Sequence, residues 1–311
     1  MSTDDVKILV IGAGVNGSAV ITKLVRAGLD ARVLARGKRY EEIKNEGIII
    51  EDPFSHKRSI TKVPVINRLD PDDIYDFILV IVRKNQIADL LPVLAQNKSE
   101  NIVFMGNNLS GPAEFAKVID RQRIMLGMVV AGGKRDGDII RAMTSTPLPS
   151  PFGEMDGTIT PRLRRLVKIL RSAGIRATTS TNMIDLQMTH AAGVAIVGKL
   201  TIKYHCDLNA FARCTEDLKL IVAARREAHQ VLHSLGHKIV PLAEDAIRFL
   251  PGFLYIASMR ALLNSKLGEV GLAYHVSQAP DEMQQLADEL RDLVDRSGLP
   301  VPAIRKVLEM N

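Results

Sequence analysis

The stretch Ile8–Ser18, ILVIGAGVNGS, decides the fold of this chain of 311 residues. Its apolar start predicts a short buried strand. Gly12, Gly14 and Gly17 follow at the spacing G-x-G-x-x-G. The first glycine lets the chain turn sharply off the strand, the second lets backbone approach a pyrophosphate, and the third lets a helix pack close to the strand. The stretch therefore predicts a dinucleotide-binding turn.

The residues that follow complete the unit. Residues 18–27 are expected to form a helix that ends at Gly28, and residues 31–35 read as a second strand. The N-terminus of such a helix offers N–H groups and a partial positive charge to phosphates. A glycine-rich turn in an ordinary α/β domain is the alternative interpretation. We expect contacts to the cofactor from Gly12, Gly14, Val15, Asn16 and Gly17.

The end of the second strand indicates which dinucleotide is bound. An acidic residue here would bind the ribose hydroxyls of NAD, whereas a basic residue neutralises the 2′-phosphate of NADP. The chain has Arg36, Lys38 and Arg39 at this point, with no acid before Glu41. We therefore expect NADP (NADPH) as cofactor, with Arg36 on the 2′-phosphate. A solvated basic loop is the alternative.

The bulk composition narrows the class of protein. The hydrophobic content of 46% supports a large core, and 311 residues suggest two domains. The net charge of +6 comes from 41 basic and 35 acidic residues that form no long run, so it suits a small anionic substrate rather than nucleic acid. Two cysteines, an acidic start and no apolar run of membrane length predict a cytoplasmic protein without a membrane span.

Two further strands are expected to end in polar residues. Residues 75–82, YDFILVIV, and residues 101–106 read as buried strands. In a doubly wound sheet, ligands lie at the carboxyl ends of such strands. A basic helix cap in solvent is the alternative for the first group. The candidate cofactor residues here are Arg83, Lys84 and Gln86 after the first strand, and Asn108, also a candidate substrate residue, after the second.

The character of the chain changes after Asn182. Strand signals stop, and residues 184–202 are apolar on all sides, which predicts a buried helix. We predict an α/β protein with an N-terminal Rossmann dinucleotide-binding domain over residues 1–182 and an all-helical domain over residues 183–311. Several of the later helices look apolar on more than one face, which suggests a homodimer. They are expected over residues 215–235, 241–250, 254–267, 280–297 and 302–309.

The order of motifs resembles the ketopantoate reductase (2-dehydropantoate 2-reductase) family over nearly the whole chain. The motifs that carry the resemblance are GAGVNG, Arg36, the segment with Gln86 after YDFILVIV, NNLSG, RDGDII, PFGEMDG with LRSAGI, REAHQVLHSLGH, and the pair Ser258–Met259. The resemblance implies an NADPH-dependent reductase of pantothenate biosynthesis, with substrate between a Rossmann and a helical domain. It also implies a lysine that acts as general acid on the substrate carbonyl, and a substrate contact at Ser258, for which a helix-surface serine is the alternative.

The chain departs from this family where the catalytic lysine is expected. Met188 stands at the lysine position and Ala192 at that of a later asparagine. His190 is the substitute that we expect to be catalytic, because an imidazole suits proton transfer. Two residues along a helix is about 200° of rotation, so His190 does not share the direction of Met188. A buried histidine bonded to a backbone carbonyl is the alternative.

Two functions remain open at this point. The first is an NADPH-dependent reductase of a small 2-oxo acid. The second is a non-catalytic NADP(H)-binding sensor or regulator that has lost its active site. The absence of any titratable donor near the substrate would favour the second.

Overall fold

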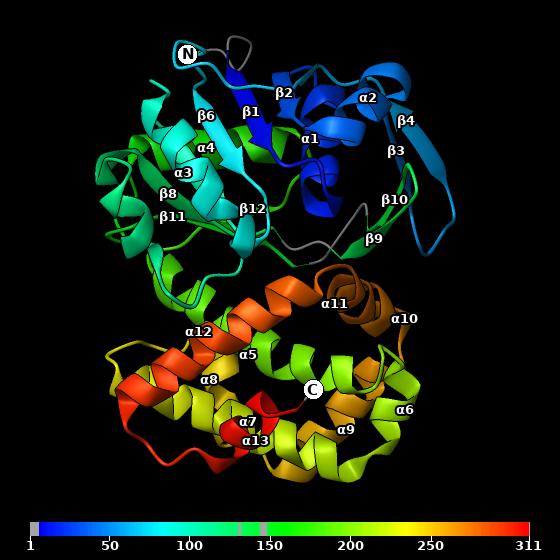
Figure 1. Cartoon of the computed structure of the whole chain (residues 1–311), viewed down its shortest axis with the longest axis vertical. Coiled ribbons are helices and arrows are strands. Elements are labelled where there is room, and N and C mark those ends of the chain that lie inside the picture. Colours follow the sequence, from blue (N-terminus) through cyan, green and yellow to red (C-terminus); the bar gives the residue numbers. More distant parts are fainter. Residues whose placement is uncertain (1–5, 130–131, 144–147, 311) are drawn as a thin grey trace. The chain divides into compact units, whose positions relative to one another are not determined.

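The computed structural model describes residues 6–129, 132–143 and 148–310. The chain divides into two compact units (Figure 1). The first comprises Met1–Gly106 and Pro112–Met183, and the second comprises Asn107–Gly111 and Ile184–Asn311. The short segment Asn107–Gly111 therefore groups with the second unit although both of its neighbours in sequence belong to the first.

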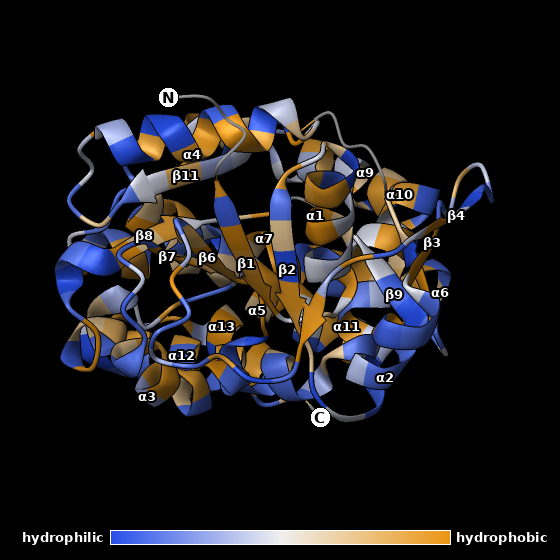
Figure 2. Cartoon of the chain, turned by 90° about the horizontal axis from the view of Figure 1, so that it is seen from above, coloured by the Kyte–Doolittle hydropathy of each residue, from blue (hydrophilic) through white to orange (hydrophobic). Residues whose placement is uncertain are grey.

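An eight-stranded sheet forms the centre of the first unit, in the order β12-β11-β8-β7-β6-β1-β2-β5. The strands from β8 to β5 are mutually parallel, and their central members are hydrophobic (Figure 2). Their bounds are β1 (Lys7–Ile11), β2 (Asp30–Leu34), β5 (Val65–Ile66), β6 (Phe77–Val80), β7 (Ile102–Met105), β8 (Ile124–Gly127), β11 (Ser150–Glu154) and β12 (Ala177–Thr179). The predicted Rossmann sheet is confirmed.

One edge of the sheet differs from a purely parallel arrangement. β11 pairs antiparallel with β8, and β12 follows β11 in parallel. The chain between β8 and β11 holds an antiparallel hairpin, β9 (Gly133–Asp136) and β10 (Ile139–Ala142), instead of a helical crossover. Without a crossover helix the chain can return in the opposite direction. Residues 133–136 form one strand of this hairpin, although their sequence carries no strong strand signal.

The hairpin belongs to a second, four-stranded sheet in the order β4-β3-β10-β9. β3 (Ile48–Glu51) and β4 (Arg58–Thr61) pair antiparallel, whereas Val65–Ile66 joins β2 in the main sheet. Helix α1 packs against β1 and β2 of the main sheet and against β9 and β10 of the small one. The helices of this unit are α1 (Val15–Arg26), α2 (Gly37–Glu46), α3 (Ile87–Gln96) and α4 (Pro161–Ser172).

The second unit is built from helices in the part of the chain that is described. Helix α7 packs against α9, α12 and α13. Gly198 of α5 lies so close to Met283 of α12 that a Cβ there would be 2.6 Å from the sulfur. The helices are α5 (Met183–Lys203), α6 (Leu208–Arg213), α7 (Thr215–Ser234), α8 (Leu242–Asp245), α9 (Gly252–Leu263), α10 (Lys266–Gly268), α11 (Tyr274–Gln278), α12 (Pro280–Ser297) and α13 (Pro302–Leu308).

The predicted helical half is confirmed, with shorter elements where the sequence suggested two longer helices. Residues 241–250 form only the short α8 and a 3₁₀ turn, Ala246–Arg248. A π-helical turn, Glu269–Ala273, separates α10 from α11. Over residues 6–129, 132–143 and 148–310, every helix is too short or too polar to cross a bilayer.

Candidate functional site

The glycine-rich turn lies between β1 and α1, and each glycine meets a different surrounding. Gly12 has φ +107°, and a Cβ there would be 2.2 Å from the carbonyl oxygen of Ile81. A Cβ on Gly17 would be 1.8 Å from the carbonyl oxygen of Gly12. Gly14 is exposed, and a Cβ on it would meet no heavy atom within 4 Å. The outer two glycines are thus required by packing, whereas Gly14 leaves open space for a ligand.

The start of α1 suits a phosphate group. Gly14 is its N-cap and provides no side-chain hydrogen bond, and the first turn carries no acidic residue. Val15 and Asn16 are the first helical residues, where N–H groups have no carbonyl partner inside the helix. The helix dipole adds a partial positive charge at this end. The local structure therefore fits a dinucleotide pyrophosphate.

Arg39 supports this turn, a role that we did not predict from the sequence. Its Nε donates to the carbonyl oxygen of Ala13 (3.2 Å), and its Nη2 donates to Ser18 Oγ (3.4 Å). Its Nη1 donates to Glu42 (3.1 Å), and the residue is buried. Arg39, one of the three basic residues after β2, therefore stabilises the glycine-rich turn through these hydrogen bonds.

Arg36 and Lys38 remain at the surface near the end of β2. Arg36 is the exposed N-cap of α2 and makes no hydrogen bond or ion pair with the residues that the structure describes. Lys38 is exposed and lies 3.9 Å from Glu42. Arg36 is thus the member of the basic group that is most available to an anion.

The three candidate cofactor residues after β6 differ in their exposure and in their contacts. Lys84 is only 4% exposed. Its ammonium contacts the carboxylate of Glu114 and lies 5.2 Å from the centre of the Phe115 ring. Arg83 is half-buried and has an interaction partner within the chain, whereas Gln86 is exposed. Glu114 therefore competes with any phosphate for Lys84, and the cofactor contacts of these three residues stay predictions.

Asn108 lies in the segment that groups with the second unit. Its Oδ1 accepts a hydrogen bond from Ser110 Oγ (3.2 Å), and the residue is buried. The segment is held to α12, because the backbone N–H groups of Leu109 and Ser110 donate to Glu289 (3.0 and 3.3 Å). A ligand contact by Asn108 stays a prediction.

Helix α5 turns His190 and the two substituted positions in different directions. Met188 and Ala192 are 3% and 1% exposed and belong to the hydrophobic core of the second unit. His190 is exposed to solvent. The difference follows from the rotation of about 200° between residues 188 and 190. His190 is thus an accessible histidine, and the alternative of a buried core histidine does not describe it.

The surroundings of His190 lower the pKa of its imidazole. Desolvation and the charges of Arg225 and His275 lower the pKa of His190 from 6.5 to about 4. The imidazole is therefore neutral at neutral pH and has one N–H group to donate.

The other candidate residues have ordinary surroundings. Ser258 is exposed on α9, and its Oγ donates to the carbonyl oxygen of Tyr255 (2.8 Å), as helix-surface serines often do. Its substrate contact stays a prediction. In the described part of the chain no group of three or more histidine, cysteine or acidic side chains is arranged to hold a metal ion.

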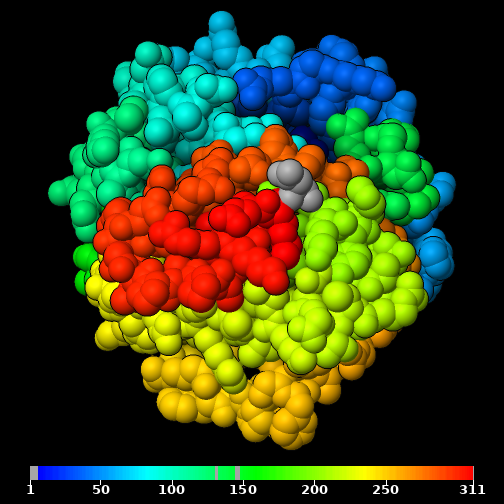
Figure 3. All heavy atoms as spheres, turned by 60° about the horizontal axis from the view of Figure 1, so that its bottom comes forward, coloured from blue at the N-terminus to red at the C-terminus, as the bar shows by residue number. Residues whose placement is uncertain are grey.

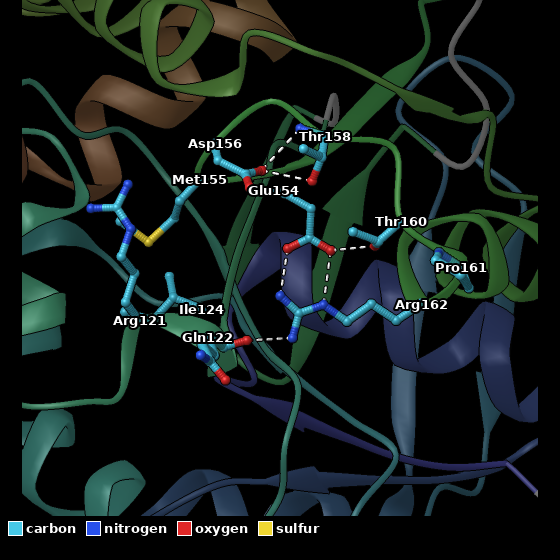
Figure 4. A pocket seen from close by; sticks show the side chains of 10 residues that line it. All are labelled: Arg121, Gln122, Ile124, Glu154, Met155, Asp156, Thr158, Thr160, Pro161 and Arg162. Atoms are coloured by element: carbon cyan, nitrogen blue, oxygen red, sulfur yellow. Dashed lines mark hydrogen bonds and ion pairs between the residues drawn. The ribbon is translucent and has the colours of Figure 1, made fainter.

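A cavity of about 510 Å³ opens where β8 begins and β11 ends, at the amino ends of the parallel strands (Figure 4). Its polar groups already bind one another. Glu154 accepts hydrogen bonds from Arg162 Nε (2.8 Å) and Thr160 Oγ1 (2.5 Å). This cavity is distant from the carboxyl ends of β1 and β6, where a doubly wound sheet binds its ligand, so we do not assign the cofactor to it.

Comparison with known proteins places these features in a family. A family model described as "Ketopantoate reductase PanE/ApbA" matches residues 8–156. A 2-dehydropantoate 2-reductase of Archaeoglobus fulgidus is 25% identical over 239 residues, which are 76% of this chain and 78% of that protein.

Solved structures share the fold over nearly the whole chain. A ketopantoate reductase homologue from Ralstonia solanacearum MolK2 has a TM-score of 0.74 at 17% identity, covering 97% of this chain and 95% of that one. D-mandelate dehydrogenase with NADH and anilino(oxo)acetate has a TM-score of 0.79 at 15% identity, covering 98% and 96%. These structures support the two-part fold that the sequence predicts.

Proposed function

Because this chain belongs to the ketopantoate reductase family, we propose that it reduces a small 2-oxo acid to the 2-hydroxy acid with NADPH. The observation that carries the proposal is the glycine-rich turn, in which Gly14 is open and α1 begins without an acidic residue. The protein is an oxidoreductase of the class that acts on CH–OH groups. The direct test is NADPH oxidation measured across a panel of 2-oxo acids, with ketopantoate included because the Archaeoglobus relative is named for it.

The residues present fit the cofactor. The N-terminus of α1 would hold the pyrophosphate, Arg36 would bind the 2′-phosphate, and Arg39 would keep the turn in shape. NADPH, when bound, supplies the hydride for the carbonyl carbon. The carbonyl oxygen gains negative charge as hydride arrives, and a donor must meet that charge. The N–H of the neutral His190 is the donor that we assign.

The non-catalytic sensor is the weaker interpretation. It required a chain without an accessible donor, whereas His190 is exposed on α5. The relatives found by comparison include a reductase and a dehydrogenase. A reductase therefore accounts for both observations.

We expect NADPH to bind more tightly than NADH, and Arg36→Asp to remove most of that preference. An exposed guanidinium without an internal partner can pair with the 2′-phosphate through two parallel hydrogen bonds. Its loss should cost about 1–3 kcal/mol of NADPH binding and leave NADH binding nearly unchanged. Titration of both cofactors by fluorescence or calorimetry measures this. Lys38→Met, next to Arg36 and equally exposed, is the control, and equal affinities of the unmodified protein for both cofactors would refute the assignment.

We further propose that the protein is a homodimer and works in the cytoplasm. The second unit exposes large hydrophobic side chains in residues 242–267, and Figure 3 shows this part of the chain, coloured gold, at the surface. We place the dimer interface on these side chains, because exposed apolar patches commonly mark interaction sites. A cytoplasmic location agrees with the two free cysteines, Cys206 and Cys214. The exposed residues are Leu242, Phe249, Phe253, Leu254, Leu262 and Leu267.

Phe253→Glu is expected to produce a monomer. Phe253 is 70% exposed, so the change places a charge in the proposed interface without disturbing the core. Sedimentation velocity at micromolar concentration should show a dimer for the unmodified protein and a monomer for the variant, with equal NADPH affinity. If the unmodified protein sediments as a monomer, the homodimer proposal is wrong.

A further inference from the structure

An arginine of α7 reaches across to α5. The guanidinium of Arg225 lies against Gly193, because a Cβ on that glycine would be 3.3 Å from Nη2 and 3.4 Å from Cζ. A Cβ at position 193 would make a tight contact with the guanidinium, which would have to shift by a few tenths of an ångström. The absence of a side chain at Gly193 therefore allows the Arg225 guanidinium to lie close to α5.

The guanidinium is held in this place but is not fully used. Its Nη2 contacts the carboxylate of Glu244 on α8, which also lies 3.5 Å from Nε2 of His229. The Arg225 side chain is 18% exposed, and its Nε has no hydrogen-bond acceptor among the described residues. Because Nε is buried and Glu244 occupies Nη2, a second carboxylate would bind the N–H groups that remain on the exposed part of the guanidinium.

His190 stands one turn before Gly193 on the same helix. His190 is exposed, and electrostatic interactions with Arg225 and with His275 on α11 contribute to lowering its pKa. The acidic neighbours of Arg225 and His275 each have a second contact. Glu244 also approaches His229, and Glu282, which lies 3.8 Å from His275, accepts a hydrogen bond from Asn107 (3.4 Å). The part of α5 around His190 therefore adjoins one arginine and one histidine, each with an acidic neighbour.

We propose that Arg225 binds the carboxylate of the 2-oxo acid substrate, while the N–H of His190 donates to its carbonyl oxygen. Both residues lie in the second unit, and the pair would perform the task for which the family resemblance implies a lysine at position 188. The ligand class is a small 2-oxo acid with one carboxylate next to the carbonyl. This inference rests on the proposed function and adds the residues that recognise the substrate.

Calorimetric titration of the NADPH-loaded protein with oxamate, a 2-oxo acid analogue that is not reduced, tests the proposal. Arg225→Met should weaken oxamate binding by about 10- to 100-fold, as expected for the loss of a charged hydrogen-bonded pair. The affinity for NADPH should stay within about 2-fold, because Arg225 does not belong to the dinucleotide-binding unit. Arg248→Met is the matched control, since it removes an equal charge from an exposed arginine that pairs with Asp245.

The outcomes are distinct. Equal oxamate affinities of Arg225→Met and the unmodified protein would overturn the assignment of Arg225 and leave the reductase proposal intact. An unmodified protein that neither binds oxamate nor oxidises NADPH with any 2-oxo acid would overturn both. If Arg225→Met does not fold, Arg225→Lys keeps the charge without the planar fork and should still weaken oxamate. In the folded, unmodified protein, oxamate must also shift the NMR resonances of the His190 ring, and unchanged resonances would contradict the proposal.

Discussion

Gly14→Ala is expected to weaken NADPH binding on the order of 100-fold while the protein remains as stable as before. A Cβ at position 14 meets no heavy atom of the protein within 4 Å, so the folded chain tolerates it. The same methyl group would occupy the space through which the pyrophosphate approaches the N–H groups of α1. Loss of two such charged hydrogen bonds corresponds to about 3 kcal/mol. Fluorescence titration with NADPH and thermal unfolding of the apoprotein measure the two effects separately.

Gly17→Ala is the counterpart with the opposite expectation. Its Cβ would be 1.8 Å from the carbonyl oxygen of Gly12, so α1 and β1 must move apart. This change should lower the melting temperature or prevent folding. If Gly14→Ala destabilises the protein as much as Gly17→Ala does, position 14 has a packing role and the open space does not serve a ligand.

His190→Ala should lower kcat by at least about 100-fold, the lower end of the range for loss of a donor to a reacting group. NADPH affinity should hardly change, because the dinucleotide-binding residues lie in the other unit. Steady-state kinetics on the best 2-oxo acid, combined with NADPH titration, make the measurement. An unchanged kcat would show that the carbonyl oxygen is stabilised by another group, and His190→Gln, which retains an N–H donor, should recover part of the activity.

The pH dependence follows from the direction of the pKa shift. The pKa of His190 is lowered to about 4 by desolvation and by the charges of Arg225 and His275. The neutral imidazole therefore predominates above pH 5, and kcat should not change through an ionisation near pH 6.5. In Arg225→Met one of the two charges is gone, so the pKa of His190 should rise. A kinetic inflection near pH 6.5 in the unmodified protein would contradict this description.

Features that depend on neighbours in sequence were predicted, and those that depend on distant contacts were not. The separate reasons for Gly12 and Gly17 follow from a strand, a turn and a helix within one short motif. The opposite directions of Met188 and His190 follow from helical rotation alone. Arg39 looked like one of three equivalent basic residues, because nothing in the sequence indicates that its guanidinium bonds to Ala13, 26 residues earlier.

Lys84 and Arg225 illustrate the same limit. The ammonium of Lys84 meets Glu114, 30 residues away along the chain, and only the folded unit brings them together. The place of Arg225 depends on a glycine of another helix. The departure at β11 has a similar origin, since its antiparallel direction results from the β9–β10 hairpin, and residues 133–136 carry no strong strand signal.

The grouping of Asn107–Gly111 with the second unit has a consequence for dissecting the protein. The chain passes between the two units after Gly106, after Gly111 and after Met183, so neither unit is a single continuous piece of sequence. A fragment that starts at Ile184 lacks the backbone N–H groups that bind Glu289 and the side chain that binds Glu282. A protease cut near residue 183 would leave the C-terminal fragment attached only by noncovalent contacts with the N-terminal fragment, including those of Leu109 and Ser110 with Glu289.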